Sequence, residues 1–127
     1  MTTKENAINW FEISVGDINR AKKFYESIFG ISMEVQNNMG MDMSYFPFDM
    51  GNGKVSGALV QGHMHKPSTD GVKLYLNANP DLANALGKVE AAGGKITMPK
   101  TKISDDIGHM AFFMDTEGNV IALHSQN

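Results

Sequence analysis

This sequence predicts a single α+β domain made of two βαβββ units related by a pseudo-twofold repeat. Hydrophobic patterns typical of a strand, a helix and three further strands follow one another in the same order in each half. One shift along the chain places Phe11 on Leu74, and the same shift places Gly30 on Gly93. Because the copies are long and only two in number, the repeat indicates a paired-unit domain and not a solenoid.

The first unit opens with a strand over residues 8–15, where apolar and polar side chains alternate. Asp17 is the expected N-cap of the helix that follows, because its carboxylate can accept hydrogen bonds from free amides of the first turn. Apolar residues at spacings of three and four predict a helix over residues 18–28. Gly30 stands just past its end, where a left-handed cap residue is favoured.

Three strands complete the first unit, over residues 32–36, 43–48 and 55–61. Asp49, Gly51, Asn52 and Gly53 favour a tight turn, so the last two strands are expected to form a hairpin. Residues 63–71 are polar and carry a proline, which is typical of a linker.

The second unit repeats this plan. A strand over residues 73–78 leads to Pro80, which favours the start of a helix over residues 82–91. We expect a short strand over 95–98, a loop over 99–108, and two strands over 109–114 and 119–124. The whole chain, residues 1–127, is then one domain, with unit one at 7–62, a linker at 63–71 and unit two at 72–125.

Composition excludes several function classes. The net charge is −3, from 11 Lys and Arg against 14 Asp and Glu, which argues against nucleic-acid partners. No apolar run is long enough to span a membrane, so no membrane partner is expected. The chain has no cysteine, which excludes disulfides and thiolate chemistry and fits a cytoplasmic protein.

Each unit carries a set of ordered motifs. The first unit has the pattern D-x-x-R-A-x-x-F-Y-x-x-x-F-G, at Asp17, Arg20, Ala21, Phe24, Tyr25, Phe29 and Gly30. The second has the helix end V-E-A-A-G-G at 89–94 and the turn D-T-E-G-N at 115–119. Together these motifs resemble those of the vicinal oxygen chelate superfamily, which includes glyoxalase I, bleomycin-resistance proteins and extradiol dioxygenases. The resemblance covers about residues 7–125 and is stronger for fold than for function.

The resemblance implies two curved sheets around a cleft, with helices on the outside, in a protein that forms a homodimer. Metal-dependent members of the family carry a ligand on the first and last strand of each unit. Here these positions are Trp10, Gly57 or Leu59, Lys73 and Ala122. None of these side chains supplies the imidazole, carboxylate or thiolate that a divalent metal requires. We therefore expect no metal and no other cofactor.

Strand alternation then directs a set of polar and aromatic side chains into the cleft. Glu12, Lys73 and His124 are the candidate catalytic residues, and Glu12 and Lys73 are expected to pair across the pseudo-twofold axis. The candidate ligand-binding residues are Trp10, Ser14, Tyr45, Tyr75, Asn77 and His109. The sequence leaves open which way Tyr45 and His109 face. His63 and His65 have no third ligand nearby, so a solvated loop is expected there.

Three functions fit these observations. The first is a glyoxalase/bleomycin-resistance-like protein with a metal-free cleft that binds a small molecule, which the ten methionines and the aromatic residues favour. The second is a glyoxalase-like lyase or related enzyme that acts through Glu12, Lys73 or His124. The third is an interaction module with a vestigial cleft. The sequence does not identify the ligand.

Overall fold

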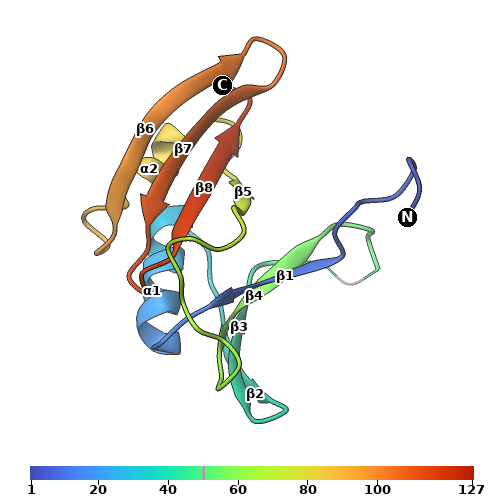
Figure 1. Ribbon diagram of the computed structural model, residues 1–127, viewed down its shortest axis with the longest axis vertical. Coiled ribbons are helices and arrows are strands. Elements are labelled where there is room, and N and C mark those ends of the chain that lie inside the picture. The colour runs from blue at the N-terminus through green and yellow to red at the C-terminus, as the bar shows by residue number, and fades with distance from the viewer. Residues whose placement is uncertain (50) are drawn as a thin grey trace.

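The computed structural model, which describes residues 1–49 and 51–127, contains two four-stranded sheets and two helices (Figure 1). The first sheet has the order β1-β4-β3-β2, in which β1 is parallel to β4 and the other neighbours are antiparallel. Its strands are β1 (Trp10–Ser14), β2 (Val35–Asn38), β3 (Met41–Tyr45) and β4 (Ser56–Gln61). The expected hairpin of β3 and β4 is confirmed, although Met50 in its turn lies outside the described residues.

The second sheet repeats this topology with the order β5-β8-β7-β6. Its strands are β5 (Tyr75–Asn77), β6 (Lys95–Ser104), β7 (Gly108–Met114) and β8 (Val120–Ser125). Each sheet therefore pairs its first strand in parallel with its last. The α+β class and the doubled βαβββ order are confirmed.

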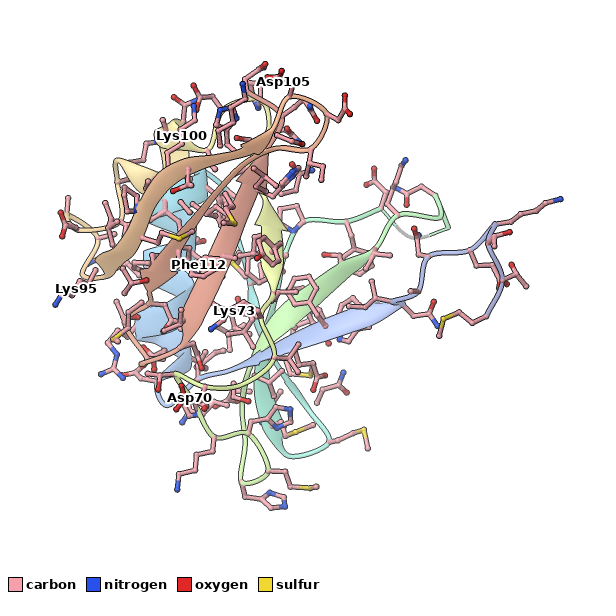
Figure 2. All side chains as sticks on the ribbon, turned by 45° about the horizontal axis from the view of Figure 1, so that its top comes forward. Asp70, Lys73, Lys95, Lys100, Asp105 and Phe112 are labelled. Atoms are coloured by element: carbon pink, nitrogen blue, oxygen red, sulfur yellow. The ribbon has the colours of Figure 1, made fainter. Side chains whose placement is uncertain are left out.

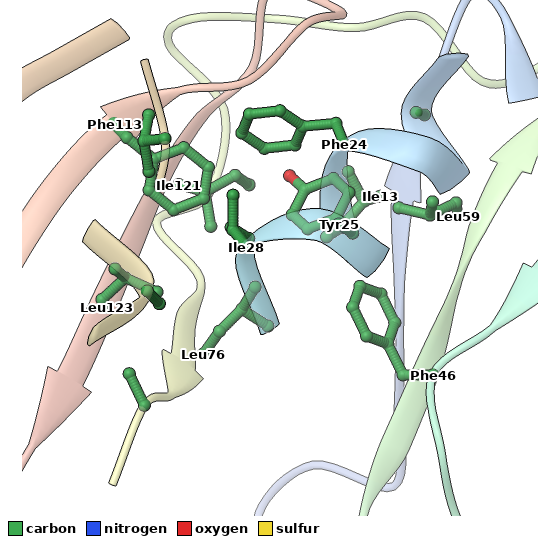
Figure 3. Packing of buried hydrophobic residues seen from close by; sticks show 14 of the residues in the cluster. Ile13, Phe24, Tyr25, Ile28, Phe46, Leu59, Leu76, Phe113, Ile121 and Leu123 are labelled. Carbon is green, nitrogen blue, oxygen red and sulfur yellow. The ribbon is translucent and has the colours of Figure 1, made fainter. Parts of the chain in front are cut away.

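Helix α1 (Ile18–Phe29) lies between the two sheets and forms the centre of the core (Figure 3). Asp17 caps it by accepting from two backbone amides, and Gly30 ends it in the left-handed conformation, as the sequence predicts. Its buried Tyr25 ring packs against Phe46 of the first half and Phe113 of the second, at centroid distances of 5.6 and 6.3 Å. One core is thus shared by both units.

A buried carboxylate joins the two units at the start of α1. Glu117, in the turn between β7 and β8, accepts hydrogen bonds from the backbone amides of Gly16 and Asp17 at 2.9 and 2.8 Å. It also binds the Arg20 guanidinium through both oxygens, at 2.7 and 2.9 Å. Burial opposes ionisation of Glu117, but these donors, with Thr116, outweigh it and hold its pKa below the ordinary value of 4.5.

The same turn makes a second contact with unit one. Asp115 accepts a hydrogen bond of 2.7 Å from the buried Tyr25 hydroxyl, and Asn119 donates one of 2.8 Å to the Ser14 carbonyl. Burial, and then the negative charge of Asp115, raise the pKa of Tyr25 well above its usual value. We call the contacts of Asp115, Glu117 and Asn119 with unit one the junction.

The second helix is shorter than expected. The sequence predicts a helix over residues 82–91, whereas α2 covers only Ala83–Leu86 and a series of turns follows it to residue 93. Several of these turns are closed by bonds between residues three apart, such as Lys88 N–H to the Ala85 carbonyl at 3.0 Å. The helices that the structure describes are all too short and too polar to serve as a membrane span.

The expected loop over residues 99–108 is wrong. Most of it belongs to β6, a ten-residue strand that pairs with β7 through three shifts of register. Pro99 is tolerated because β6 is the edge strand and the proline falls within one of these shifts, where no ladder hydrogen bond is lost.

Candidate functional site

All of the predicted cleft residues except His109 lie on the sheet faces that are turned away from α1, which we call the outer faces. On the first sheet, Phe11, Ile13 and Leu59 face the core around α1. Trp10, Glu12 and Ser14 alternate with them and therefore lie on the outer face. Since α1 lies between the sheets, one chain does not close a cleft between its own two outer faces (Figure 3).

Three aromatic rings gather on the outer face of unit one. The Trp10 ring lies 5.9 Å from Tyr45 and 5.8 Å from Phe48, and Tyr45 lies 6.4 Å from Phe48, measured between ring centroids. The rings are tilted or edge-on, with Trp10 37% and Phe48 44% exposed. Tyr45 therefore faces the predicted site. We call Trp10, Tyr45 and Phe48 the aromatic triad.

Glu12 pairs with a residue that the sequence does not indicate. Its Oε1 lies 2.7 Å from Nε2 of His65, which belongs to a tight hairpin closed by the His65 N–H and the Gly62 carbonyl at 3.0 Å. The His65 side chain is 17% exposed, so the expected solvated loop is wrong for this residue. The expected contact between Glu12 and Lys73 is also wrong, because Glu12 pairs with His65 and Lys73 packs elsewhere.

Unit two carries its own aromatic group. The Lys73 ammonium lies 5.7 Å above the Phe112 ring, and Tyr75 lies 6.1 Å from the same ring in an edge-on contact. Figure 2 shows Lys73 close to Phe112, in front of the second sheet. Tyr75 is 48% exposed, so this face also presents an apolar ring to solvent.

The other predicted residues of unit two are divided between two faces. Asn77 and His124 are register partners on the outer face, but His124 Nε2 is bonded to the Ile107 carbonyl at 2.6 Å and Asn77 accepts from Asn79. His109 alternates with Met110 and pairs with the buried Ser125, which places it on the core side. His109 therefore does not belong to the outer-face group.

The register of the strands corrects one of the predicted metal-ligand positions. In each sheet, three outer-face residues lie side by side across neighbouring strands. Glu12, Ala58 and Tyr45 are register partners in unit one, as Tyr75, Ala122 and Phe112 are in unit two. The outer-face position that corresponds to Ala122 is therefore Ala58, and the expectation of Gly57 or Leu59 is wrong. Gly57 faces the core, where β1 approaches so closely that any Cβ would overlap Phe11.

The residues at the four corrected positions do not fit a divalent metal. Trp10, Ala58, Lys73 and Ala122 offer no imidazole or carboxylate, and a protonated lysine repels a cation. Among residues 1–49 and 51–127, no three His, Asp or Glu side chains are grouped as a metal would need. No chemical step can be derived through a metal from this donor set.

Two cavities lie where the units meet. The larger, about 650 Å³, has an apolar floor from Phe11, Ile28 and Phe46 and is bordered by β5 with Tyr75 and Asn77. The smaller, about 190 Å³, is lined by Glu12 and Ser14 of β1 and by Lys66, among others. The larger volume lies within the range of small-molecule sites.

Comparison with known sequences identifies relatives along almost the whole chain. CFP32 of Mycobacterium tuberculosis, named as a candidate glyoxylase, is 29% identical over 134 aligned residues that include 98% of this chain. The chain spans 47% of the length of CFP32, or about half. A glyoxylase-like domain-containing protein of Didymella fabae is 28% identical, with 91% of each chain covered.

Solved structures share the fold. A V278E mutant of glyoxalase I from Zea mays superposes with a TM-score of 0.67 at 18% identity, over 93% of this chain and 45% of the other. TnmS3 of Streptomyces sp. CB03234, described as an antibiotic binding protein, superposes with a TM-score of 0.66 at 21% identity. The superposition covers 99% of this chain and 100% of TnmS3. The sequence model of the Glyoxalase/Bleomycin resistance protein/Dioxygenase superfamily matches residues 7–123, and the chain belongs to this family.

Proposed function

We propose that this protein is a homodimeric, cytoplasmic small-molecule-binding protein whose cleft works without a metal. The outer face of unit one from one copy and the outer face of unit two from a second copy line each cleft. The ligand is a planar aromatic molecule, because both faces present exposed rings that stack on flat apolar surfaces.

The observation that carries the proposal is the division of the site between two outer faces. Trp10, Glu12 and Tyr45 lie on one face and Lys73 and Tyr75 on another, with the shared core and α1 between the sheets. A twofold dimer satisfies this geometry, since it presents each face to its complement on the partner copy. The free edges of β1 and β5 supply unpaired backbone groups that favour such an association.

We favour binding over catalysis because each candidate catalytic side chain is already engaged in another contact. The His124 imidazole is hydrogen-bonded to a backbone carbonyl, and the Glu12 carboxylate is hydrogen-bonded to His65. The Lys73 ammonium packs on the Phe112 ring. These three groups do not converge on one point of the described chain. The likeness to an antibiotic binding protein supports the same choice.

The test is calorimetric titration of the purified protein with a panel of planar aromatic compounds, with and without a chelator. We expect saturable binding that the chelator leaves unchanged and that Trp10→Ala abolishes. Met39→Ala is the matched control, because Met39 is 92% exposed at the β2–β3 turn and contributes nothing to either face. Absence of saturable binding, or binding that needs added metal, would overturn the proposal.

A further inference from the structure

The hydrogen bond between Glu12 and His65 has a defined direction. The His65 Nδ1 is buried and has no hydrogen-bond partner among the described residues. A proton on Nδ1 would therefore be a buried, unpaired donor, which is costly. The imidazole proton belongs on Nε2, from where it donates to Glu12 Oε1 at 2.7 Å. His65 Nε2 is then the donor and Glu12 Oε1 the acceptor of this hydrogen bond.

The hairpin of His65 follows directly on the end of β4. Its first residue, Gly62, lies beside Met41 of β3, where an added Cβ would come within 2.8 Å of Cγ, and the hydrogen bond of 2.7 Å to Glu12 places the His65 ring at β1. His65 thereby fixes one oxygen of Glu12. The other oxygen, Oε2, takes part in no hydrogen bond or ion pair with the described residues and belongs to a side chain that is 35% exposed.

The aromatic triad lies beside this carboxylate. Trp10 precedes Glu12 by two residues on the same face, which separates them by about 7 Å along the strand. Tyr45 lies in the same row as Glu12, on the far side of the small Ala58. A fixed carboxylate next to exposed aromatic rings is suited to an organic cation, because both the charge and the negative ring faces attract it.

Two lysines belong to the proposed cleft or to its border. The Lys73 ammonium is placed over Phe112, and Lys66 lines the small cavity that Glu12 borders. Within the described part of the chain, neither forms an ion pair with Glu12 inside 4.0 Å. Within the described chain, the Glu12 carboxylate therefore has no cation in direct contact. The Lys73 that shares the proposed cleft belongs to the partner copy, where its ammonium packs on Phe112.

Building on the proposed small-molecule cleft, we propose that its unit-one half selects a protonated aromatic amine. The ligand ring packs on the aromatic triad, and its N–H donates to Glu12 Oε2. His65 is a positioning residue, since it touches the carboxylate and not the ligand. The proposal adds charge selectivity to a site for which the function above requires only a flat apolar ligand.

Three acridines of similar shape test this selectivity: 9-aminoacridine, which is cationic at neutral pH, acridine, which is neutral, and acridine-9-carboxylate, which is anionic. Trp10 is the only tryptophan in the chain, so quenching of its fluorescence reports on this face directly. We expect the cationic compound to bind about tenfold more tightly than the neutral one. Equal affinities, or tightest binding of the anion, would overturn the inference while leaving the binding function in place. No saturable quenching by any of the three would overturn both.

Variants assign the selectivity to the pair. Glu12→Gln should remove the preference for the cation, whereas Glu34→Gln, which changes an exposed acid on the same unit, should leave both the preference and the affinity for neutral acridine unchanged. His65→Leu should reduce the preference, and His65→Gln, which keeps a donor, should restore most of it. An unchanged preference in Glu12→Gln would contradict the proposal.

Discussion

The junction and the outer faces of this protein use similar side chains in opposite ways. At the junction, Glu117 accepts hydrogen bonds from two amides, a guanidinium and a hydroxyl, and its side chain is fully buried. On the outer face of unit one, Glu12 has one partner among the described residues, and its neighbour Trp10 is 37% exposed. A carboxylate whose acceptor capacity is filled stabilises the fold, whereas one with a free oxygen beside open rings is available to a ligand.

The largest loss of stability is expected from Glu117→Ala. It leaves the amides of Gly16 and Asp17 and the Arg20 guanidinium without their acceptor, and the free energy of unfolding should fall by about 3 kcal/mol. Urea unfolding measures the change, with Glu34→Ala as the control for removal of an exposed acid. A loss no larger than that of the control would mean that the junction does not hold the units together.

Tyr25→Phe should lower the free energy of unfolding by less, about 1 kcal/mol, because it removes one buried hydrogen bond and preserves the ring packing. Asp115 still accepts from Asn119 at 3.1 Å, so its carboxylate is not left without a partner. Thermal unfolding detects the change. A loss as large as that of Glu117→Ala would show that Glu117 does not dominate the junction.

Trp10→Ala should lower the free energy of unfolding by about 1 kcal/mol or less, because the ring is already partly exposed. Removal of a buried tryptophan side chain lowers it by about 3–5 kcal/mol. Ligand binding should nevertheless be lost. Calorimetry and urea unfolding on the same preparation separate the two effects. Loss of several kcal/mol with unchanged binding would make Trp10 a core residue and reverse the comparison.

The smallest of the expected losses of stability comes from protonation of Glu117 at the junction in mild acid. The pKa of Glu117 is lowered in the folded state, so its contribution is fully present above pH 4.5 and is lost as the pH falls through the folded-state pKa. Unfolding measured below pH 4.5 should show a shallower decline in Glu117→Gln than in the native protein. Parallel pH profiles would mean that other carboxylates account for the whole acid response.

The sequence predicts well those elements whose ends are set by residues close to them in the chain. Helix α1 was predicted within one residue of its end, because Asp17, Gly30 and the apolar spacing each act over a single turn. β6 was missed because Pro99 indicates a loop unless the strand lies at a sheet edge, which only the tertiary structure shows. The short α2 was missed because apolar spacing does not distinguish a helix from successive turns.

The candidate site was harder to predict. β4 is buried on both faces, so it has no alternation to set its register, and Ala58 was missed for that reason. His65 reaches Glu12 across 53 positions of sequence through a hairpin, and the pattern H-x-H carries no signal for such a contact. The outer-face placement of Trp10, Glu12 and Tyr75 followed from simple strand alternation.

The central claim is that each cleft combines unit one of one copy with unit two of another, and mixing two disabled variants tests it most directly. Trp10→Ala disables the first face and Tyr75→Ala the second, so each variant alone should fail to bind acridine. Dissociated and reassociated together, they should regain binding, because the mixed dimer contains one cleft in which both faces are intact. A mixture that binds no better than the separate variants would contradict the claim.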